Sequence, residues 1–191
     1  MAELIVTENI TLDGVVSVPM EEDGSKDDWF ETSMRDDRAA WAEVEVAEAI
    51  EATALLLGRR TDEYFGRRWN NRTGVWAERL NALPKFVVSS TIDEATWQNS
   101  TVLSDDVADE VAELKRNLDG VIVTYGSRQL MQALLKNDLV DEVRLLVFPV
   151  IQGSGERLFD AIGSATALRL DSVRQVGEGI ARLTYRVERA Q

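Results

Sequence analysis

Residues 121–159 read VIVTYGSRQLMQALLKNDLVDEVRLLVFPVIQGSGERLF, and this stretch decides the fold class. It starts with an apolar run, continues with the helix formers of residues 128–138, and returns to an apolar run at 140–151. The last run is apolar on both faces, which is typical of a strand in the middle of a sheet. The stretch therefore predicts a strand, a helix and a central strand of an α/β sheet.

The same alternation extends toward the N-terminus. The expected strands are residues 4–11, 54–57, 85–91 and 100–104, and the expected helices are 38–53, 61–69, 74–83 and 105–120. Helix 38–53 has an apolar stripe through Trp41, Val44, Ala47 and Ile50 or Glu51. The acidic residue at position 51 indicates that the stripe ends there.

The C-terminal part has a different pattern. Residues 167–176 and 181–189 flank the turn-like GEGI, and the second arm alternates apolar and polar residues, so we predict an antiparallel hairpin. Residues 19–38 are acidic and are expected to form a loop or short helix anchored by Trp29 and Phe30. The fold class is α/β: one three-layer α/β/α domain over residues 1–191, with a mixed, mostly parallel sheet.

Composition excludes several classes of function. The 191 residues include no cysteine and no histidine, which removes disulfides, thiol nucleophiles, ordinary zinc sites and the usual general base. A net charge of −13 argues against nucleic acid as the main partner. There is no apolar run of membrane-spanning length and no basic N-terminal leader, so we expect a cytoplasmic protein that does not bind membranes.

One basic island interrupts the acidic chain. Residues 1–52 contain 15 acids and 3 bases, whereas residues 58–72 contain five arginines and two acids. Arg59 and Arg60 directly follow the strand-like ALLLG, and Thr61 is expected to cap the next helix. Arginine forks of this kind suit the oxygens of a small phosphorylated ligand.

Three strand-to-helix junctions could bind such a ligand: LLLGRRTDE, VVSSTID and IVTYGSRQL. Ligands of open α/β sheets bind beyond the carboxyl ends of the strands, where helix N-termini offer free N–H groups. Each junction alone could be a plain turn or strand exit. Neither the GxGxxG fingerprint nor a GxxxxGK[ST] loop is present, so the sequence supports no Rossmann or P-loop assignment.

These motifs, together with TLDG at residues 11–14, resemble the dihydrofolate reductase-like superfamily. The sequence is most similar to the branch of stand-alone bacterial proteins related to the reductase domain of riboflavin biosynthesis, the RibD C-terminal type. The resemblance covers roughly residues 3–187. It implies a sheet of about eight strands, NADPH as the hydride donor, a small-molecule substrate and a homodimer.

The resemblance also implies which residues form the site. The cofactor-binding residues are expected to be Gly58, Arg59, Arg60, Thr61, Ser89, Ser90, Thr91, Tyr125, Gly126, Ser127, Arg128 and Gln129. The substrate is expected near Asp13, Gly14, Trp29 and Phe30. Apart from the resemblance, Arg157 is the only cation of the segment PVIQGSGERLF at residues 149–159, so we expect it to contact a substrate that carries a phosphate. The segment DDWFETSMRDD lacks the single clean acid that binds pterin in dihydrofolate reductases, which disfavours folate as the substrate.

The proton that accompanies hydride needs a donor other than histidine. Asp13 is our first candidate because its turn follows a strand end, and Asp27 or Asp28 beside Trp29 is the second. Asp13 could equally be an ordinary Asp-Gly turn residue. The leading interpretation is an NADPH-dependent reductase, and the alternatives are a non-catalytic nucleotide-binding module or a structural dimer of the same fold.

Overall fold

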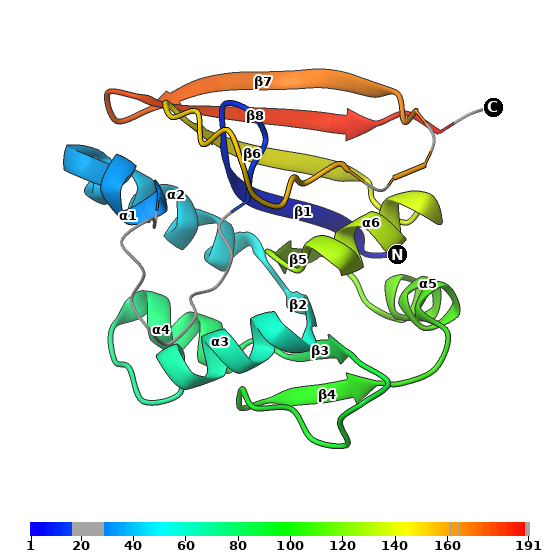
Figure 1. Ribbon diagram of the computed structural model, residues 1–191. Coiled ribbons are helices and arrows are strands. Elements are labelled where there is room, and N and C mark those ends of the chain that lie inside the picture. Colours follow the sequence, from blue (N-terminus) through cyan, green and yellow to red (C-terminus); the bar gives the residue numbers. More distant parts are fainter. Residues whose placement is uncertain (17–28, 161, 164, 190–191) are drawn as a thin grey trace.

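The computed structural model describes residues 1–16, 29–160, 162–163 and 165–189. Within them, eight strands form one mixed sheet in the order β4-β3-β2-β5-β1-β6-β8-β7 (Figure 1). The strands are β1 (Glu3–Thr11), β2 (Ala54–Gly58), β3 (Lys85–Val88), β4 (Ser100–Leu103), β5 (Val121–Tyr125), β6 (Glu142–Phe148), β7 (Leu168–Val176) and β8 (Ile180–Val187). The pairs from β4 to β6 are parallel, whereas β8 runs antiparallel to both β6 and β7. The predicted fold class and terminal hairpin are confirmed.

Helices cover both faces of this sheet. They are α1 (Trp29–Met34), the 3₁₀ turn η1 (Arg35–Asp37), α2 (Arg38–Glu51), α3 (Arg59–Trp69), α4 (Val75–Ala82), α5 (Val107–Asn117) and α6 (Arg128–Lys136). Residues of α5 and α6 pack on one face, and residues of α1 to α4 pack on the other. The result is the predicted three-layer arrangement. None of the helices described here is long and apolar enough to span a membrane.

Strand β1 lies between β5 and β6, and its side chains point alternately to the two faces of the sheet. Leu4, Val6 and Ile10 belong to the core under α5 and α6. Asn9 points to the other face, where its Oδ1 accepts a hydrogen bond from Trp41 Nε1 of α2. By the same alternation, Glu8 occupies an apolar position on the α6 face.

The apolar stripe predicted for α2 is wrong in its second half. Ala47 and Ile50 are exposed, whereas Glu45 and Glu48 are buried against the sheet. The reason is ionic: the Glu48 carboxylate lies 3.1 Å from a guanidinium nitrogen of Arg144 on β6 and 3.2 Å from Arg182 on β8. Buried acids of this kind are tolerated when cations meet them in the interior.

The start of α3 also differs from the prediction. The helix begins at Arg59 and its N-cap is Gly58, so Thr61 lies inside the first turn and is not the cap. In addition, β3 ends at Val88, three residues before the expected end at residue 91, and β5 ends at Tyr125, two residues before the expected end at residue 127. The residues between strand and helix are therefore turns, which is what a ligand-binding edge requires.

Candidate functional site

The turns that follow β2 and β5 meet at the carboxyl edge of the sheet. Gly58 N donates to Ser127 Oγ at 2.9 Å, and Ser127 Oγ lies 2.9 Å from Thr61 Oγ1. Gly126 and Ser127 both have left-handed backbone angles, with φ of 54° and 59°. Two of the predicted junctions are thus joined through one hydroxyl group.

Two helices begin at this junction with their first N–H groups available. Neither α3 nor α6 has a side-chain hydrogen bond at its N-cap. The opening N–H groups of a helix have no partner within the helix, and the helix dipole makes this end favourable for an anion. The junction therefore has the donor set of a phosphate site.

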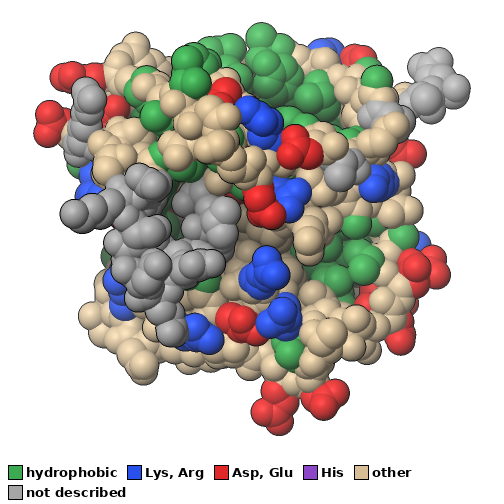
Figure 2. Space-filling view, in the orientation of Figure 1, with side chains coloured by type: hydrophobic (Ala, Val, Ile, Leu, Met, Phe, Trp, Pro, Cys, Tyr) green, Lys and Arg blue, Asp and Glu red, His purple; other side chains and the backbone are tan. Residues whose placement is uncertain are grey.

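The basic residues at this edge are not equivalent. Arg59 NH1 lies 2.7 Å from Glu63 Oε1, one helical turn along α3. Arg60 is exposed, and its side chain has no partner among the described residues. Figure 2 shows basic and acidic side chains close together in the middle of this face. Of the two arginines predicted to bind phosphate, Arg60 is therefore the one whose side chain has no ion pair within the described part of the chain.

Of the remaining predicted cofactor residues, some are already bound to other residues and others are exposed. Arg128 at the start of α6 is already bound to Glu156, with NH2 2.8 Å from Oε1, whereas Gln129 is exposed. Tyr125 is the last residue of β5, and its ring packs against Phe65 on the α3 face. Only the backbone of Tyr125 therefore belongs to the turn.

The third junction follows β3, the neighbour of β2, since Gly58 pairs with Val88. The hydroxyl groups of Ser89 and Thr91 lie 3.2 Å apart, and Ser89 Oγ also accepts a hydrogen bond from Thr91 N. Ser90 and Thr91 are exposed. The structure thus places all three predicted junctions on one edge, with the hydroxyl-rich segment beside the arginine-bearing one.

Asp13 is an anchor between two loops. Its carboxylate accepts hydrogen bonds from Thr11 Oγ1 at 2.7 Å, Gln152 N at 3.0 Å and Gly153 N at 2.9 Å. These bonds, that of Thr11 first, lower the pKa of Asp13 to about 2. Arg157 Nε donates to the Asp13 carbonyl oxygen at 3.1 Å. A carboxylate held ionised in this way is unsuited to donate a proton, contrary to our expectation.

The predicted aromatic contacts of the substrate are largely core residues. Trp29 is buried, and its ring lies 5.3 Å from that of Phe148 on β6. Phe30 contacts the rings of both Phe148 and Trp41. The second pair of candidate proton donors, Asp27 and Asp28, lies outside the described residues. Gly14 has a φ of 82° and completes the turn after β1.

Sequence reasoning missed Glu8, which lies beside the junction. It is 9% exposed, accepts a hydrogen bond from Gly126 N, and its Oε2 has no partner among the described residues. Burial raises the pKa of Glu8 to about 8. The signal was present in the alternation of LIVTENITL, where Glu8 takes the place of an apolar residue between Val6 and Ile10.

A second missed group lies under α2 on the opposite face of the sheet. Burial raises the pKa of Glu45 well above its ordinary value, and the neighbouring Glu48 adds to this. The Tyr125 hydroxyl is buried near the same acids, and its pKa is also raised, mainly by burial. In the described part of the chain, neither this hydroxyl nor Thr7 Oγ1 has a hydrogen-bond partner. This interior is unusually polar for the space between a helix and a sheet.

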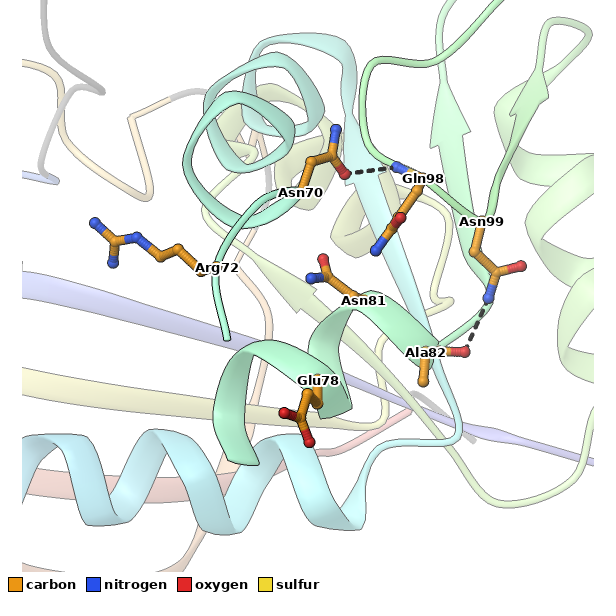
Figure 3. A pocket seen from close by; sticks show the side chains of 7 residues that line it. All are labelled: Asn70, Arg72, Glu78, Asn81, Ala82, Gln98 and Asn99. Carbon is orange, nitrogen blue, oxygen red and sulfur yellow. Dashed lines mark hydrogen bonds between the residues drawn. The ribbon is translucent and has the colours of Figure 1, made fainter. Parts of the chain in front are cut away.

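A separate hollow of about 670 Å³ lies between the end of α3, α4 and the segment before β4 (Figure 3). Its asparagines already make structural hydrogen bonds: Asn70 Oδ1 accepts from Gln98 N, and Asn99 Nδ2 donates to Ala82 O. The hollow lies at the amino ends of β3 and β4, away from the three junctions. It contains none of the predicted site residues.

Two proteins of Bacillus subtilis are similar to this chain in sequence. The uncharacterised protein YyaP of Bacillus subtilis is 27% identical over 136 residues, which is 69% of this chain and 72% of YyaP. A second uncharacterised B. subtilis protein, YwjB, is 28% identical over 95 residues, or 50% of this chain and 55% of YwjB.

Solved structures confirm the expected dihydrofolate reductase-like fold. A protein from Shewanella sp. PV-4 that has been assigned to riboflavin biosynthesis superimposes with a TM-score of 0.67 at 20% identity, covering 99% of this chain and all of that one. Dihydrofolate reductase from Enterococcus faecalis, solved with NADP(H), gives 0.59 at 16% identity, with 98% and 97% covered. The model of the RibD C-terminal domain matches residues 2–182. This chain therefore belongs to the RibD C-terminal domain family.

Proposed function

We propose that this protein is an NADPH-dependent reductase that transfers hydride to a small heterocyclic or carbonyl substrate. The observation that carries the proposal is the pair of joined turns after β2 and β5, where Ser127 Oγ bonds to Gly58 N and Thr61 Oγ1. Two helices without side-chain caps begin there. Membership of the RibD C-terminal domain family supports the same class of reaction.

The donor set suits a phosphorylated dinucleotide. The turn of Gly126 and Ser127 and the N–H groups that open α6 would hold the pyrophosphate. The free guanidinium of Arg60, with the hydroxyl groups of Ser89, Ser90 and Thr91, would hold the 2′-phosphate that distinguishes NADPH from NADH. These roles need only donors and one cation, and the edge supplies both.

Bound NADPH would supply the hydride, and the chain's own residues would bind and orient it. Asp13 contributes by position, because it ties the turn after β1 to residues 152 and 153. Its low pKa assigns the accompanying proton to another group or to water. Arg157 is bound to Asp13 but half-exposed, so one part of its guanidinium remains available to a substrate anion.

The proposal is tested by titrating the protein with NADPH and with NADH while following cofactor fluorescence. Arg60→Ala should weaken NADPH binding by about 10-fold or more and leave NADH binding nearly unchanged, because a charged hydrogen bond to the 2′-phosphate is lost. Arg68→Ala is the matched control, since Arg68 is exposed further along α3 and, among the described residues, contacts only the Tyr64 ring.

Equal losses for the two cofactors would remove Arg60 from the 2′-phosphate site. No binding of NADPH at sub-millimolar concentration would refute the proposed function. Binding without NADPH oxidation, against a panel of pterins, pyrimidines and small carbonyl compounds, would favour the alternative of a non-catalytic nucleotide-binding module.

We also propose that two copies associate through β7. Among the described strands, β7 pairs only with β8, which leaves its other edge without a neighbour. Leu168, Leu170 and Val173 are 38%, 50% and 58% exposed, and their pairing with alternate residues of β8 puts them on one face. Figure 2 shows apolar side chains gathered at the top of the view, where β7 lies. An exposed apolar strand face suits a protein partner of the same kind.

A further inference from the structure

Glu8 places a carboxyl group beneath the turn that joins β5 to α6. The side chain is 9% exposed, and the carboxyl group accepts a hydrogen bond from Gly126 N. Its Oε2 has no partner in the described part of the chain. A buried polar atom without a partner is costly, so this arrangement requires a reason beyond the stability of the ligand-free protein.

The position of Glu8 creates a conflict of charge. The N-terminus of α6 is the place where the junction offers N–H groups to an anion. An ionised Glu8 would occupy the same end of the helix from below, and interior charges are screened weakly. A neutral Glu8 removes the repulsion. It still accepts from Gly126 N through its carbonyl oxygen and gains an O–H donor.

We propose that Glu8 is a positioning residue that must be protonated when the phosphates of a dinucleotide bind at the turn of Gly126 and Ser127. The inference rests on the proposed function, because it concerns the same cofactor site. In this arrangement Glu8 holds the turn in place in either charge state, but only its neutral form admits a second anion above it. Cofactor binding and proton uptake are then linked.

The surroundings of Glu8 support this assignment. Burial raises its pKa to about 8, so Glu8 is neutral at pH 7 and begins to ionise slightly above it. The other charged or titratable groups around this end of the sheet are Arg59, Arg60 and Glu63 of α3, Arg128 of α6 with its partner Glu156, Asp13 with Arg157, and Tyr125 and Glu45 on the opposite face.

Few of these groups change their charge between pH 7 and pH 10, the range in which Glu8 is expected to ionise. The arginines remain charged throughout. Asp13 remains ionised because its pKa is about 2, whereas the pKa of Tyr125 is raised well above its ordinary value of 10. Glu45 is the exception: its pKa is also raised, by burial first and then by the charges of Glu48 and Glu8, so the comparison with Glu8→Gln is what assigns a titration to Glu8. Lys85, whose pKa burial lowers to about 8, lies at the amino end of β3.

The test measures the dissociation constant of NADPH from pH 6 to pH 10 for the wild type and for Glu8→Gln. The wild-type dissociation constant should not change with pH below pH 7. It should then rise, approaching tenfold per pH unit above about pH 8, because Glu8 must then take up a proton from the solution each time NADPH binds. Glu8→Gln keeps an acceptor for Gly126 N and carries no charge, so its constant should lack this rise. Glu43→Gln, an exposed acid on the outer side of α2, should retain the wild-type profile.

Calorimetry provides a second readout that a purely structural role would not affect. Titrations at pH 9 in two buffers of different ionisation enthalpy count the protons taken up on binding. We expect about one proton per NADPH for the wild type and none for Glu8→Gln. The same pH rise in both proteins, or no proton uptake by the wild type, would overturn the inference. If Glu8→Gln does not fold, the wild-type proton count decides alone.

The inference and the proposed function fail in different ways. If NADPH does not bind at any pH, the proposed function is refuted, and inorganic pyrophosphate is then titrated into the same two proteins. A rise of its dissociation constant with pH that depends on Glu8 would support the inference for anions in general. No pyrophosphate binding, or the same profile in both proteins, would overturn it.

Discussion

The carboxylate of Asp13 stabilises the native state through its ionised form. It accepts hydrogen bonds from Thr11 Oγ1 and from the backbone of residues 152 and 153, and its pKa falls to about 2 from an ordinary value of 3.8. This contribution is complete above about pH 4 and is lost as the pH falls toward 2, because protonation removes the acceptor charge. Asp13→Asn should therefore lower the free energy of unfolding at pH 5 and flatten its fall between pH 4 and pH 2.

Urea denaturation at half-unit pH intervals measures this difference. Asp171→Asn, at an exposed position of β7, is the control and should keep the wild-type acid dependence. Parallel curves for wild type and Asp13→Asn would show that the carboxylate is not held by these bonds.

For single residues, the sequence predicts the backbone conformation better than it predicts the function of the side chain. The Asp-Gly pair predicted the turn after β1, and Gly14 has the expected positive φ. The backbone partners of the Asp13 carboxylate, however, are 139 and 140 positions away, and no local pattern indicates them. Glu8 is the opposite case, because its acidic side chain at an apolar position was readable in the alternation of β1.

Helix α3 illustrates how an element can depend on one missing side chain. A Cβ atom on Gly66 would lie 2.8 Å from Trp97 N and 2.9 Å from the Thr96 carbonyl carbon, so the helix approaches the backbone of this segment closely. Asp62 holds the same segment, because its carboxylate accepts hydrogen bonds from Thr96 N and Trp97 N. The helix and the loop before β4 are thus fixed to each other at two points.

Gly66→Ala should therefore destabilise the protein by about 1–3 kcal/mol, the usual cost of overpacking. Helix propensity alone would predict a gain of about 1 kcal/mol for the same change. Urea denaturation distinguishes the two, with Arg68→Ala on the exposed side of α3 as a control expected to change stability by less than about 0.5 kcal/mol. A stabilised Gly66→Ala would mean that the segment can move aside.

Helix α2 shows the limit of pattern reading for elements. The apolar stripe rule placed Ala47 and Ile50 against the sheet, and both are exposed. The helix turns Glu45 and Glu48 inward instead, since Arg144 and Arg182 meet the second acid from distant strands. The local sequence shows that the segment is helical. It does not show which face is buried, because that depends on arginines of distant strands.

The whole molecule leaves the open edge of the sheet at β7 available to a partner. Leu170→Lys should convert a dimer into a monomer, because a charge on the apolar face of β7 would be desolvated by association. Sedimentation velocity across micromolar concentrations measures the change. Val75→Lys is the control, since Val75 is 72% exposed on α4, and it should leave the assembly unchanged. A monomeric wild type would contradict the proposed dimer.

The architecture as a whole was largely predictable. The β-α alternation gave the class, the alternating C-terminal arms gave the hairpin, and the strand ends gave an edge on which three junctions meet. Fine geometry was not predictable, because it depends on contacts between residues far apart in the chain. The single hydroxyl that joins the turns, Ser127 Oγ, and the pairing that leaves Arg60 free of Glu63 are of this kind.

The placement of β1 has a consequence for biosynthesis. Of the strands of this domain, β1 is translated first, yet it is an inner strand: Glu3 pairs with Val121 of β5, and Ile5 pairs with Glu142 of β6. Its apolar residues cannot be buried between these neighbours until most of the chain has been translated, and such distant pairings slow folding. The nascent chain must therefore keep β1 unpaired and prone to aggregation until β5 and β6 have been translated, and chaperones would protect it during that time.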